Sequence, residues 1–97
     1  EVGLPTEFAL KQNYPNPFNP STQIQYALPN ESSVVISIYD ITGRLVRTLV
    51  NEFQSPGYRT VTWNATNDMG RPVSAGMYIY SIHAGDFIQN RKMILMK

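Results

Sequence analysis

Apolar and polar residues alternate along most of the chain, in short runs separated by turn-forming residues. The clearest run, residues 21–28, alternates apolar or β-branched residues with glutamines, and residues 33–39 repeat the pattern with valine and isoleucine. Alternation with a period of two is typical of a strand that buries one face. We therefore predict two strands here. Their inward positions are Thr22, Ile24, Tyr26, Leu28, Val34, Ile36 and Ile38.

Three further segments have weaker strand patterns. Residues 7–12 are expected to form a short edge strand, and residues 58–64 a strand with Trp63 on its inner face. In residues 44–50 the apolar spacing also fits one or two helical turns, but the valine and threonine content and the tight turn before it favour a strand. Residues 51–57 (NEFQSPG) are polar and end in Pro-Gly, so we expect a loop there.

The last part of the chain, residues 76–97, is predicted to be a long β-hairpin. Its first arm is residues 77–84, its turn is Gly85-Asp86, and its second arm is residues 87–97. Both faces of the first arm are fairly apolar, which indicates a central or partly covered strand.

Two segments are expected to cross between strands without regular structure. Residues 13–20 (NYPNPFNP) hold three prolines, which exclude a helix or a central strand. We expect a stiff, polyproline-like crossing over one end of the fold, with Tyr14 and Phe18 available to fill the core. Residues 65–75, rich in Asn, Asp, Gly and Pro, form the second crossing, and residues 40–43 (DITG) have the composition of a β-turn.

About seven short strands with turns every eight to twelve residues are typical of an all-β, immunoglobulin-like β-sandwich. The chain has no cysteine, so the disulfide framework of antibody domains is excluded. Its 97 residues correspond to one domain. It begins without a methionine or a signal peptide. We therefore expect residues 1–6 to be the remnant of a linker and residues 7–97 to be the C-terminal domain of a larger protein.

Charge gives no indication of a nucleic-acid or membrane partner. The formal net charge is +1 and the charged residues are scattered, whereas a nucleic-acid site needs a basic stripe. No apolar run approaches the roughly 18 residues of a membrane span. We expect a monomer without a cofactor.

Candidate catalytic and metal-binding residues are few. His83 is the only histidine and has no Ser or Asp at a motif spacing, so we interpret it as an ordinary strand residue. Asn64, Asn67 and Asp68 offer oxygen ligands for calcium, but the glycine at position 70 comes too late for an EF-hand loop. Turn hydrogen bonds explain these residues equally well. We therefore predict no catalytic and no metal site, while calcium binding by residues 64–70 stays open.

Two surface features have alternative interpretations. Four aromatic residues could form a platform for sugar rings, although aromatic residues in so small a sandwich more often fill the core. They are Tyr14, Phe18, Tyr58 and Trp63. The cations Arg91, Lys92 and Lys97 could protect a solvated strand edge. They could instead be presented to a receptor, by strand addition or by capture of the terminal carboxylate.

Four stretches form a recognisable set: residues 13–20 (NYPNPFNP), 39–44 (YDITGR), 76–78 (GMY) and 92–97 (KMILMK). In composition and separation they resemble the C-terminal sorting domains of the type IX secretion system of Bacteroidetes and related Gram-negative bacteria. The resemblance covers residues 8–97. The proline-rich opening together with the closing Lys-Met-apolar-Lys stretch gives it its specificity.

The resemblance implies an immunoglobulin-like domain that folds in the periplasm as the last domain of a secreted or surface protein. The outer-membrane secretion machinery would read it, and a sortase-like peptidase would cut near residues 1–6. The upstream cargo would then be released or attached to an anionic lipopolysaccharide at the cell surface. The implied recognition residues are Pro15, Asn16, Pro17, Gly76, Tyr78, Lys92, Met93, Ile94, Leu95, Met96 and Lys97.

A second resemblance concerns residues 63–78, which are similar to the immunoglobulin-like domain of flagellar hook-capping proteins, with Asn64 where those proteins more usually have Asp. The leading hypothesis is thus a non-enzymatic export and sorting domain. The alternatives are a carbohydrate-binding or cell-attachment module of a glycoside hydrolase, and a structural spacer or assembly domain.

Overall fold

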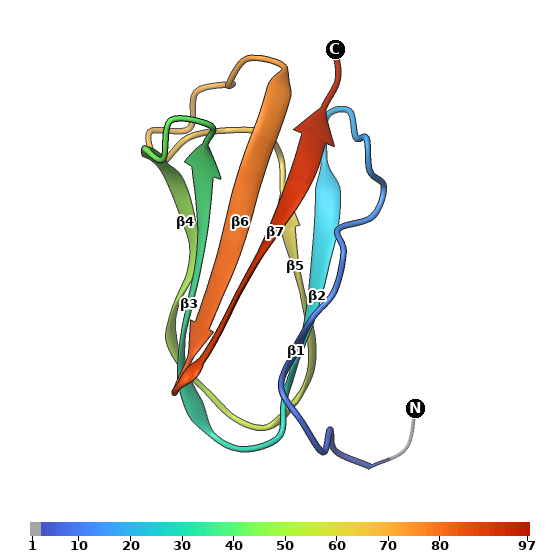
Figure 1. Ribbon diagram of the computed structural model, residues 1–97, viewed down its shortest axis with the longest axis vertical. Coiled ribbons are helices and arrows are strands. Elements are labelled where there is room, and N and C mark those ends of the chain that lie inside the picture. Colours follow the sequence, from blue (N-terminus) through green and yellow to red (C-terminus); the bar gives the residue numbers. More distant parts are fainter. Residues whose placement is uncertain (1–2) are drawn as a thin grey trace.

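The computed structural model describes residues 3–97, which form seven antiparallel strands in two sheets (Figure 1). The strands are β1 (Ala9–Leu10), β2 (Thr22–Leu28), β3 (Ser32–Asp40), β4 (Leu45–Gln54), β5 (Gly57–Trp63), β6 (Gly76–Ala84) and β7 (Phe87–Leu95). Residues 3–97 contain no helix long and apolar enough to cross a membrane. The all-β prediction is confirmed.

The two sheets pack face to face as an immunoglobulin-like sandwich. One sheet has the order β1-β2-β5 and the other β4-β3-β6-β7, with the four-stranded sheet toward the viewer in Figure 1. The seven positions predicted to face inward on β2 and β3 are all buried. They meet the inward residues of β5, β6 and β7, among them Trp63, Tyr80 and Ile82, which are fully buried.

Strand β4 corrects one prediction and confirms another. The segment 44–50 is a strand, as favoured, but the expected loop at 51–57 is wrong, because β4 continues to Gln54 and pairs there with Ser32. Residues 51–53 are polar or exposed because β4 is an edge strand of its sheet. A polar stretch can therefore form a strand when one edge and one face meet solvent.

The helix-like spacing of β4 arises from two irregularities in its pairing with β3. The register shifts between Ile36 and Ser37 and again between Ile38 and Tyr39, and each shift leaves one residue of β4 without a partner. An extra residue reverses which side chains point inward. Val46, Leu49 and Val50 accordingly all pack against the core.

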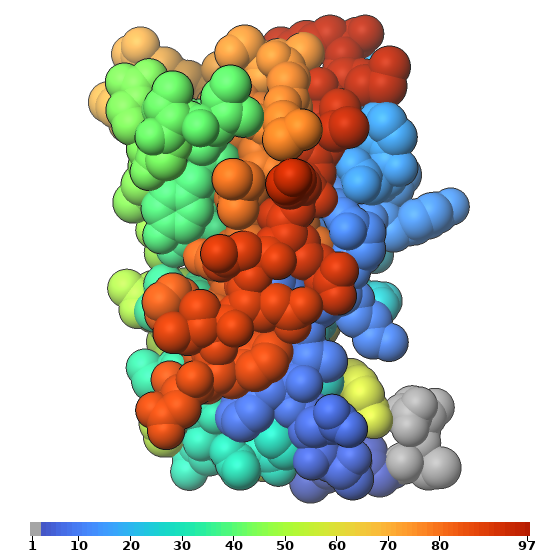
Figure 2. Space-filling model, in the orientation of Figure 1, coloured from blue at the N-terminus to red at the C-terminus, as the bar shows by residue number. Residues whose placement is uncertain are grey.

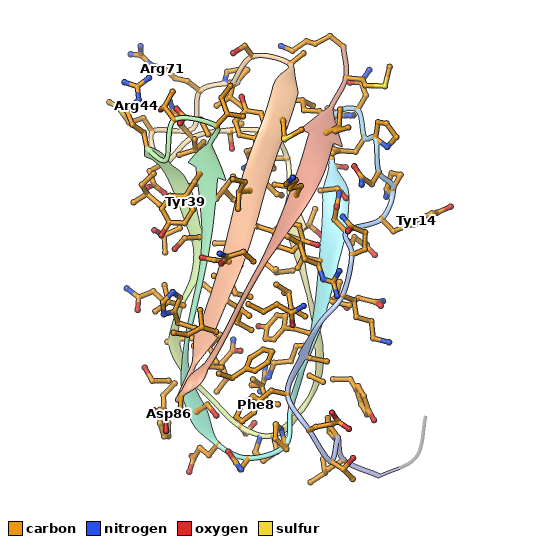
Figure 3. All side chains as sticks on the ribbon, in the orientation of Figure 1. Phe8, Tyr14, Tyr39, Arg44, Arg71 and Asp86 are labelled. Atoms are coloured by element: carbon orange, nitrogen blue, oxygen red, sulfur yellow. The ribbon has the colours of Figure 1, made fainter. Side chains whose placement is uncertain are left out.

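The crossing at residues 13–20 differs from the prediction in its path. It bends at residues 15–17 and again at 19–20, so it is not a polyproline-like rod. Phe18 fills the core at 2% exposure, but Tyr14 is 80% exposed and projects from the side of the molecule (Figure 3). Tyr14 pairs with Gln23, whose side chain faces solvent. This pairing directs the tyrosine away from the core.

The terminal hairpin and the turn at residues 40–43 form where they were expected. The hairpin turn is Gly85-Asp86, although the second strand ends at Leu95 and leaves Met96 and Lys97 beyond it. The first strand is shorter than predicted and covers only Ala9–Leu10.

Candidate recognition site

The three segments that hold the implied recognition residues come together at one end of the sandwich. Strand β6 begins beside the end of β7, with Gly76 opposite Leu95 and Tyr78 opposite Met93. The proline-rich crossing lies on the other side of β7, as the ribbon shows near the C-terminus (Figure 1). Three segments therefore lie side by side at this end, with β7 in the middle: residues 13–18, 76–78 and 92–97.

Hydrogen bonds join the proline-rich crossing to the end of β7. The backbone N–H of Ile94 donates to Oδ1 of Asn16 (3.0 Å), and the carbonyl oxygen of Ile94 accepts from the N–H of Phe18 (2.9 Å). The N–H of Met96 donates to the carbonyl oxygen of Phe18 (2.9 Å). Because these edge groups are already paired, the crossing occupies the position that an added partner strand would take at Ile94 and Met96.

Residues 10–12, just before the proline-rich crossing, also bond to β7. Gln12 Nε2 donates to the carbonyl oxygen of Lys92 (2.8 Å), and Arg91 Nε donates to that of Leu10 (2.7 Å). In the space-filling view the blue N-terminal segment lies directly beside the red atoms of β7 (Figure 2). Arg91, which is half-buried, is thus tied to the fold through its Nε.

Three aromatic rings support this end from inside. The rings of Phe18 and Trp63 have centroids 5.7 Å apart, and those of Trp63 and Tyr78 are 5.3 Å apart in an edge-to-face arrangement. Trp63 Nε1 donates to the carbonyl oxygen of Thr66 and the Tyr78 hydroxyl to that of Ser74. Aromatic pairs of this geometry stabilise a core beyond their buried area. Tyr78 therefore positions the site and does not face a partner.

The eleven implied residues divide into two groups by exposure. Tyr78, Met93 and Leu95 are buried. The exposed members are Pro15, Asn16, Pro17, Gly76, Lys92, Ile94, Met96 and Lys97. On the outer face of the four-stranded sheet, Met77, which is 42% exposed, lies opposite Ile94 at 41%. We call Met77, Lys92, Ile94 and Met96 the β7-end surface.

Tyr80 fixes the N-terminal segment across this site. It is fully buried, its hydroxyl donates to the carbonyl oxygen of Lys11 (2.7 Å), and it accepts from the N–H of Asn13 (2.8 Å). Burial raises the pKa of the Tyr80 hydroxyl, which keeps it a donor. The Asn13 side chain in turn donates to Thr22 Oγ1 (3.0 Å), and this hydroxyl donates to the carbonyl oxygen of Pro15 (2.8 Å).

Sequence reasoning missed this network. Tyr80 is 67 positions from Asn13 and 69 from Lys11, and no local motif signals such a contact. The only available signal was that the polar residue Thr22 shares the inward parity of Ile24, Tyr26 and Leu28 on its strand. Buried polar groups of this kind are almost always hydrogen-bonded.

The loop considered for calcium binding uses its oxygens in local contacts. Asn67 Oδ1 accepts from the N–H groups of Met69 (2.9 Å) and Arg71 (3.0 Å). Asp68 Oδ1 accepts from the N–H of Thr48 (3.0 Å) and lies 3.9 Å from Arg47 Nε. Over residues 3–97, no group of three or more His, Cys, Asp and Glu side chains gathers as a metal site would require. These Asx residues build the turn and cover the edge of β4.

The structure also locates His83 and the four aromatic residues considered as a sugar-binding platform. His83 is exposed on β6, between Val35 and Ile88 in the register. The four-membered aromatic platform is wrong for Phe18 and Trp63, which are 2% and 0% exposed. Only Tyr14 and Tyr58 remain at the surface, at 80% and 52% exposure.

The chain matches a known family of immunoglobulin-like domains. A family model for the FlgD Ig-like domain matches residues 19–86, which is more than half of the chain. The chain belongs to the FlgD Ig-like domain family. The resemblance of residues 63–78 to hook-capping proteins predicted this relationship. No curated protein matches the chain.

Solved structures share the fold over nearly the whole chain. A chain of PorZ, described as an essential bacterial surface component of the type IX secretion system of Porphyromonas gingivalis, is 20% identical with a TM-score of 0.61. Dimeric latent PorU from the same organism is 24% identical with a TM-score of 0.69. Each match covers 93% of this chain, which spans only 11% of the PorZ chain and 9% of the PorU chain. At these identities the likeness is one of fold.

Proposed function

We propose that this FlgD Ig-like domain directs the export and surface sorting of a larger protein through the type IX secretion system. One observation carries the proposal. Three segments that resemble sorting-domain motifs, far apart in the sequence, are bonded together at one end and expose the β7-end surface beside them. A receptor that read this surface would recognise only the folded domain.

The extent of the family match supports a special role for this end. The matched region, residues 19–86, spans β2 to β6 and excludes residues 13–18 and the whole of β7. The excluded segments are the two that bond to each other around Ile94. The part of the chain beyond the general family pattern thus supplies most of the proposed recognition site, and the start of β6, with Met77, supplies the rest from within the matched region. The likeness of this fold to part of PorZ, a component of the type IX secretion system, also supports the proposed sorting role.

The shape of the domain suits a sorting role. The described chain starts at the end opposite the C-terminus, along a long axis of 38 Å (Figure 1). A cargo domain joined before residue 3 would leave the β7-end surface uncovered. Leu4 is 63% exposed and Thr6 is also exposed, but Pro5 between them is buried, so we expect a peptidase to reach only the exposed positions on either side of it. Residues 1 and 2, where cleavage was also expected, lie outside the described residues.

The chemistry of the proposed surface is that of a protein-docking site and needs no catalytic residue. It combines the apolar side chains of Met77, Ile94 and Met96 with the cation of Lys92. Methionine adapts its shape to a partner, and apolar centres with charged rims are common at transient interfaces. The expected partner is an outer-membrane protein of the secretion machinery that offers an apolar surface with an acidic rim.

A reporter fusion tests the proposal. Residues 1–97 are placed after an inert reporter with an N-terminal signal peptide, in a host with type IX secretion and in the same host without it. The proposal expects the reporter in the medium or on the cell surface of the first host only. A reporter that stays periplasmic in both hosts contradicts it. Deleting residues 91–97 would be a poor test, because it removes the core residues Met93 and Leu95.

A further inference from the structure

The outer face of the four-stranded sheet exposes more apolar surface than the sorting role uses. This face is toward the viewer in Figure 1 and Figure 2. Exposed apolar residues lie at both of its ends, with Leu45, Met77 and Ile94 at one and Phe53 and Ile88 at the other. Each of them is between 41% and 65% exposed. An apolar patch that extends over a face in this way often marks a site of protein association.

Small polar residues cross the middle of the face. Pairing across the four strands places Thr48, Ser37, Ser81 and Asn90 in one row. Ser37 and Ser81 are each only 5% exposed, so they lie low between larger neighbours. Hydroxyl and amide groups both donate and accept hydrogen bonds, so two copies of this row can bond to each other. Along its strands the face therefore reads apolar, polar, apolar.

The rows on either side of the middle row complement each other. On one side the row is Leu45, Tyr39, Ile79 and Lys92, and on the other it is Asn51, Val35, His83 and Ile88. A two-fold axis that crosses the strands at the middle row exchanges these two rows. Tyr39 then meets Val35 of a second copy, and the apolar stem of Lys92 lies over Ile88 of that copy. Such self-complementarity is what a symmetric interface between identical chains requires.

The face carries almost no charge. Among the outward side chains of its four strands in the described chain, Lys92 is the one permanent cation and none is a carboxylate, since Arg47 turns aside to bond Thr66 and Asn67. A nucleic acid or an acidic protein would need several cations here. Under the two-fold axis the two Lys92 side chains are about 13 Å apart along the strands, which exceeds the screening length of about 8 Å at physiological ionic strength. Two copies of the face therefore meet without strong repulsion.

The size of the face suits a dimer that forms and dissociates. Strands β6 and β7 are nine residues long, and four strands lie side by side. At the ordinary rise and spacing of strands the face measures about 30 Å by about 19 Å, so two faces in contact bury about 1,100 Å² or more. A specific interface needs about 1,000 Å², whereas obligate dimers bury about 2,000 Å² or more.

We propose that this face is the interface of a weak, symmetric dimer, in which the four-stranded sheets of two copies of the chain pack on each other. The strands of the two sheets run within about 30° of each other, the usual angle for aligned sheets. This arrangement departs from the monomer expected from the sequence. Met77 and Ile94 also belong to the β7-end surface, so the dimer covers part of that surface. The inference itself rests on the whole face and not on the sorting role.

Sedimentation velocity and NMR spectra of the 97-residue chain test the proposal at protein concentrations between about 10 µM and about 1 mM, where an interface of this size is expected to dissociate. Amide signals of Ile79, Ser81 and Asn90 should shift with concentration. Those of Gln23 and Gln25, which face solvent on the other sheet, should not. Asn90→Lys should weaken the dimer about tenfold or more, because it brings two ammonium groups together across the two-fold axis.

Two further variants make the result decisive. Gln25→Lys makes the same change from amide to ammonium on an exposed position of the other sheet and should leave the dimer unchanged. Ile88→Ser lies outside the β7-end surface and should weaken the dimer without changing export of the reporter fusion, so failure of either proposal can be told from failure of the other. Thermal unfolding followed through the buried Trp63 checks that each variant is folded.

Three results would each overturn the inference. The first is a chain that stays monomeric at every concentration, which would leave the face to another partner. The second is equal association of the folded Asn90→Lys and Gln25→Lys variants. The third is a set of concentration-dependent shifts confined to the three-stranded sheet.

Discussion

The backbone N–H of Ile94 donates to Oδ1 of Asn16 over 3.0 Å, although 78 positions separate the two residues in the chain. Asparagine thus acts as a surrogate strand partner, since its side-chain oxygen satisfies a group that a neighbouring strand would otherwise bond. Together with the backbone bonds of Phe18 to Ile94 and Met96, it makes the proline-rich crossing the neighbour of the last strand.

Asn16→Ala tests the strength of this link. The loss of one hydrogen bond in a partly solvated position should lower the free energy of unfolding by about 1 kcal/mol. Amide hydrogen exchange at Ile94 should accelerate more than at residues in the middle of β7. Asn19→Ala, which changes another exposed asparagine of the same crossing, should have a smaller effect on both quantities. Equal effects of the two variants would show that the Asn16 contact is not specific.

Tyr80→Phe should destabilise the domain more, by about 1–3 kcal/mol, because it leaves the buried N–H of Asn13 and the carbonyl oxygen of Lys11 without the hydroxyl. Urea unfolding measures the change. As a matched control, Tyr39→Phe alters a half-buried tyrosine of the outer face and should change stability by less than about 0.5 kcal/mol. A loss for Tyr80→Phe no larger than the control's would contradict the anchoring role.

Alkaline pH should destabilise the native protein through the same residue. Burial raises the pKa of Tyr80 above its ordinary value of 10.0, and burial also raises that of Tyr26. A raised pKa means that the folded state holds its proton longer than the unfolded state, so stability is complete below pH 10 and falls as pH rises through the folded pKa. Tyr80→Phe should reduce this fall without abolishing it, because Tyr26 remains. Unfolding midpoints between pH 8 and 11.5 measure the effect.

Acid should weaken the turn that begins at Asp40. Its carboxylate accepts from the Thr42 hydroxyl (2.6 Å) and from the N–H groups of Thr42 (2.9 Å) and Arg44 (3.1 Å). These bonds, led by the Thr42 hydroxyl, hold the pKa of Asp40 below its ordinary value of 3.8. A lowered pKa contributes stability above pH 3.8 that is lost as pH falls through the folded value. Asp40→Asn should remove this part of the acid dependence, and Thr42→Val should remove a portion of it. If titration of Asp40 by NMR gave a pKa at or above 3.8, the account of the turn would be wrong.

Gly76→Ala tests the start of β6. Gly76 has φ of +145°, a conformation that L-residues rarely adopt, while an added Cβ would have no atom within 4 Å. The cost is therefore one of backbone conformation and should be about 1–2 kcal/mol in thermal or urea unfolding. Met77→Ala at the next, exposed position should cost much less. Similar losses for both would point to side-chain packing as the cause.

Much of the fold could be predicted because its strands bury one face. Alternation placed the inward residues of β2 and β3 correctly, and Gly85-Asp86 marked the hairpin turn. The extent of β4 could not be predicted, because its register shifts and its exposed edge remove the alternation on which strand prediction depends. Proline content likewise gave no information on the path of residues 13–20, which is set by pairing with Gln23 and Ile94.

The candidate site was predictable only as separate segments. Resemblance identified residues 15–17, 76–78 and 92–97, but it did not separate those that face inward from those that face solvent. The side toward which Met93 and Leu95 point depends on their pairing with β6. The Tyr80 network depends on contacts more than sixty positions apart, which no local pattern encodes.

The most direct test compares two variants in the reporter fusion, with substitutions on the outer face of β7 and of the residue that follows its end. Ile94→Ser with Met96→Ser alters the β7-end surface, whereas Ile88→Ser changes a 60% exposed residue at the other end of the strand. All three residues are exposed, so both variants should fold, which thermal unfolding checks. The account predicts that the Ile94, Met96 variant accumulates in the periplasm while the Ile88 variant is exported normally. Normal export of a folded Ile94, Met96 variant would contradict the claim that this surface is the export signal.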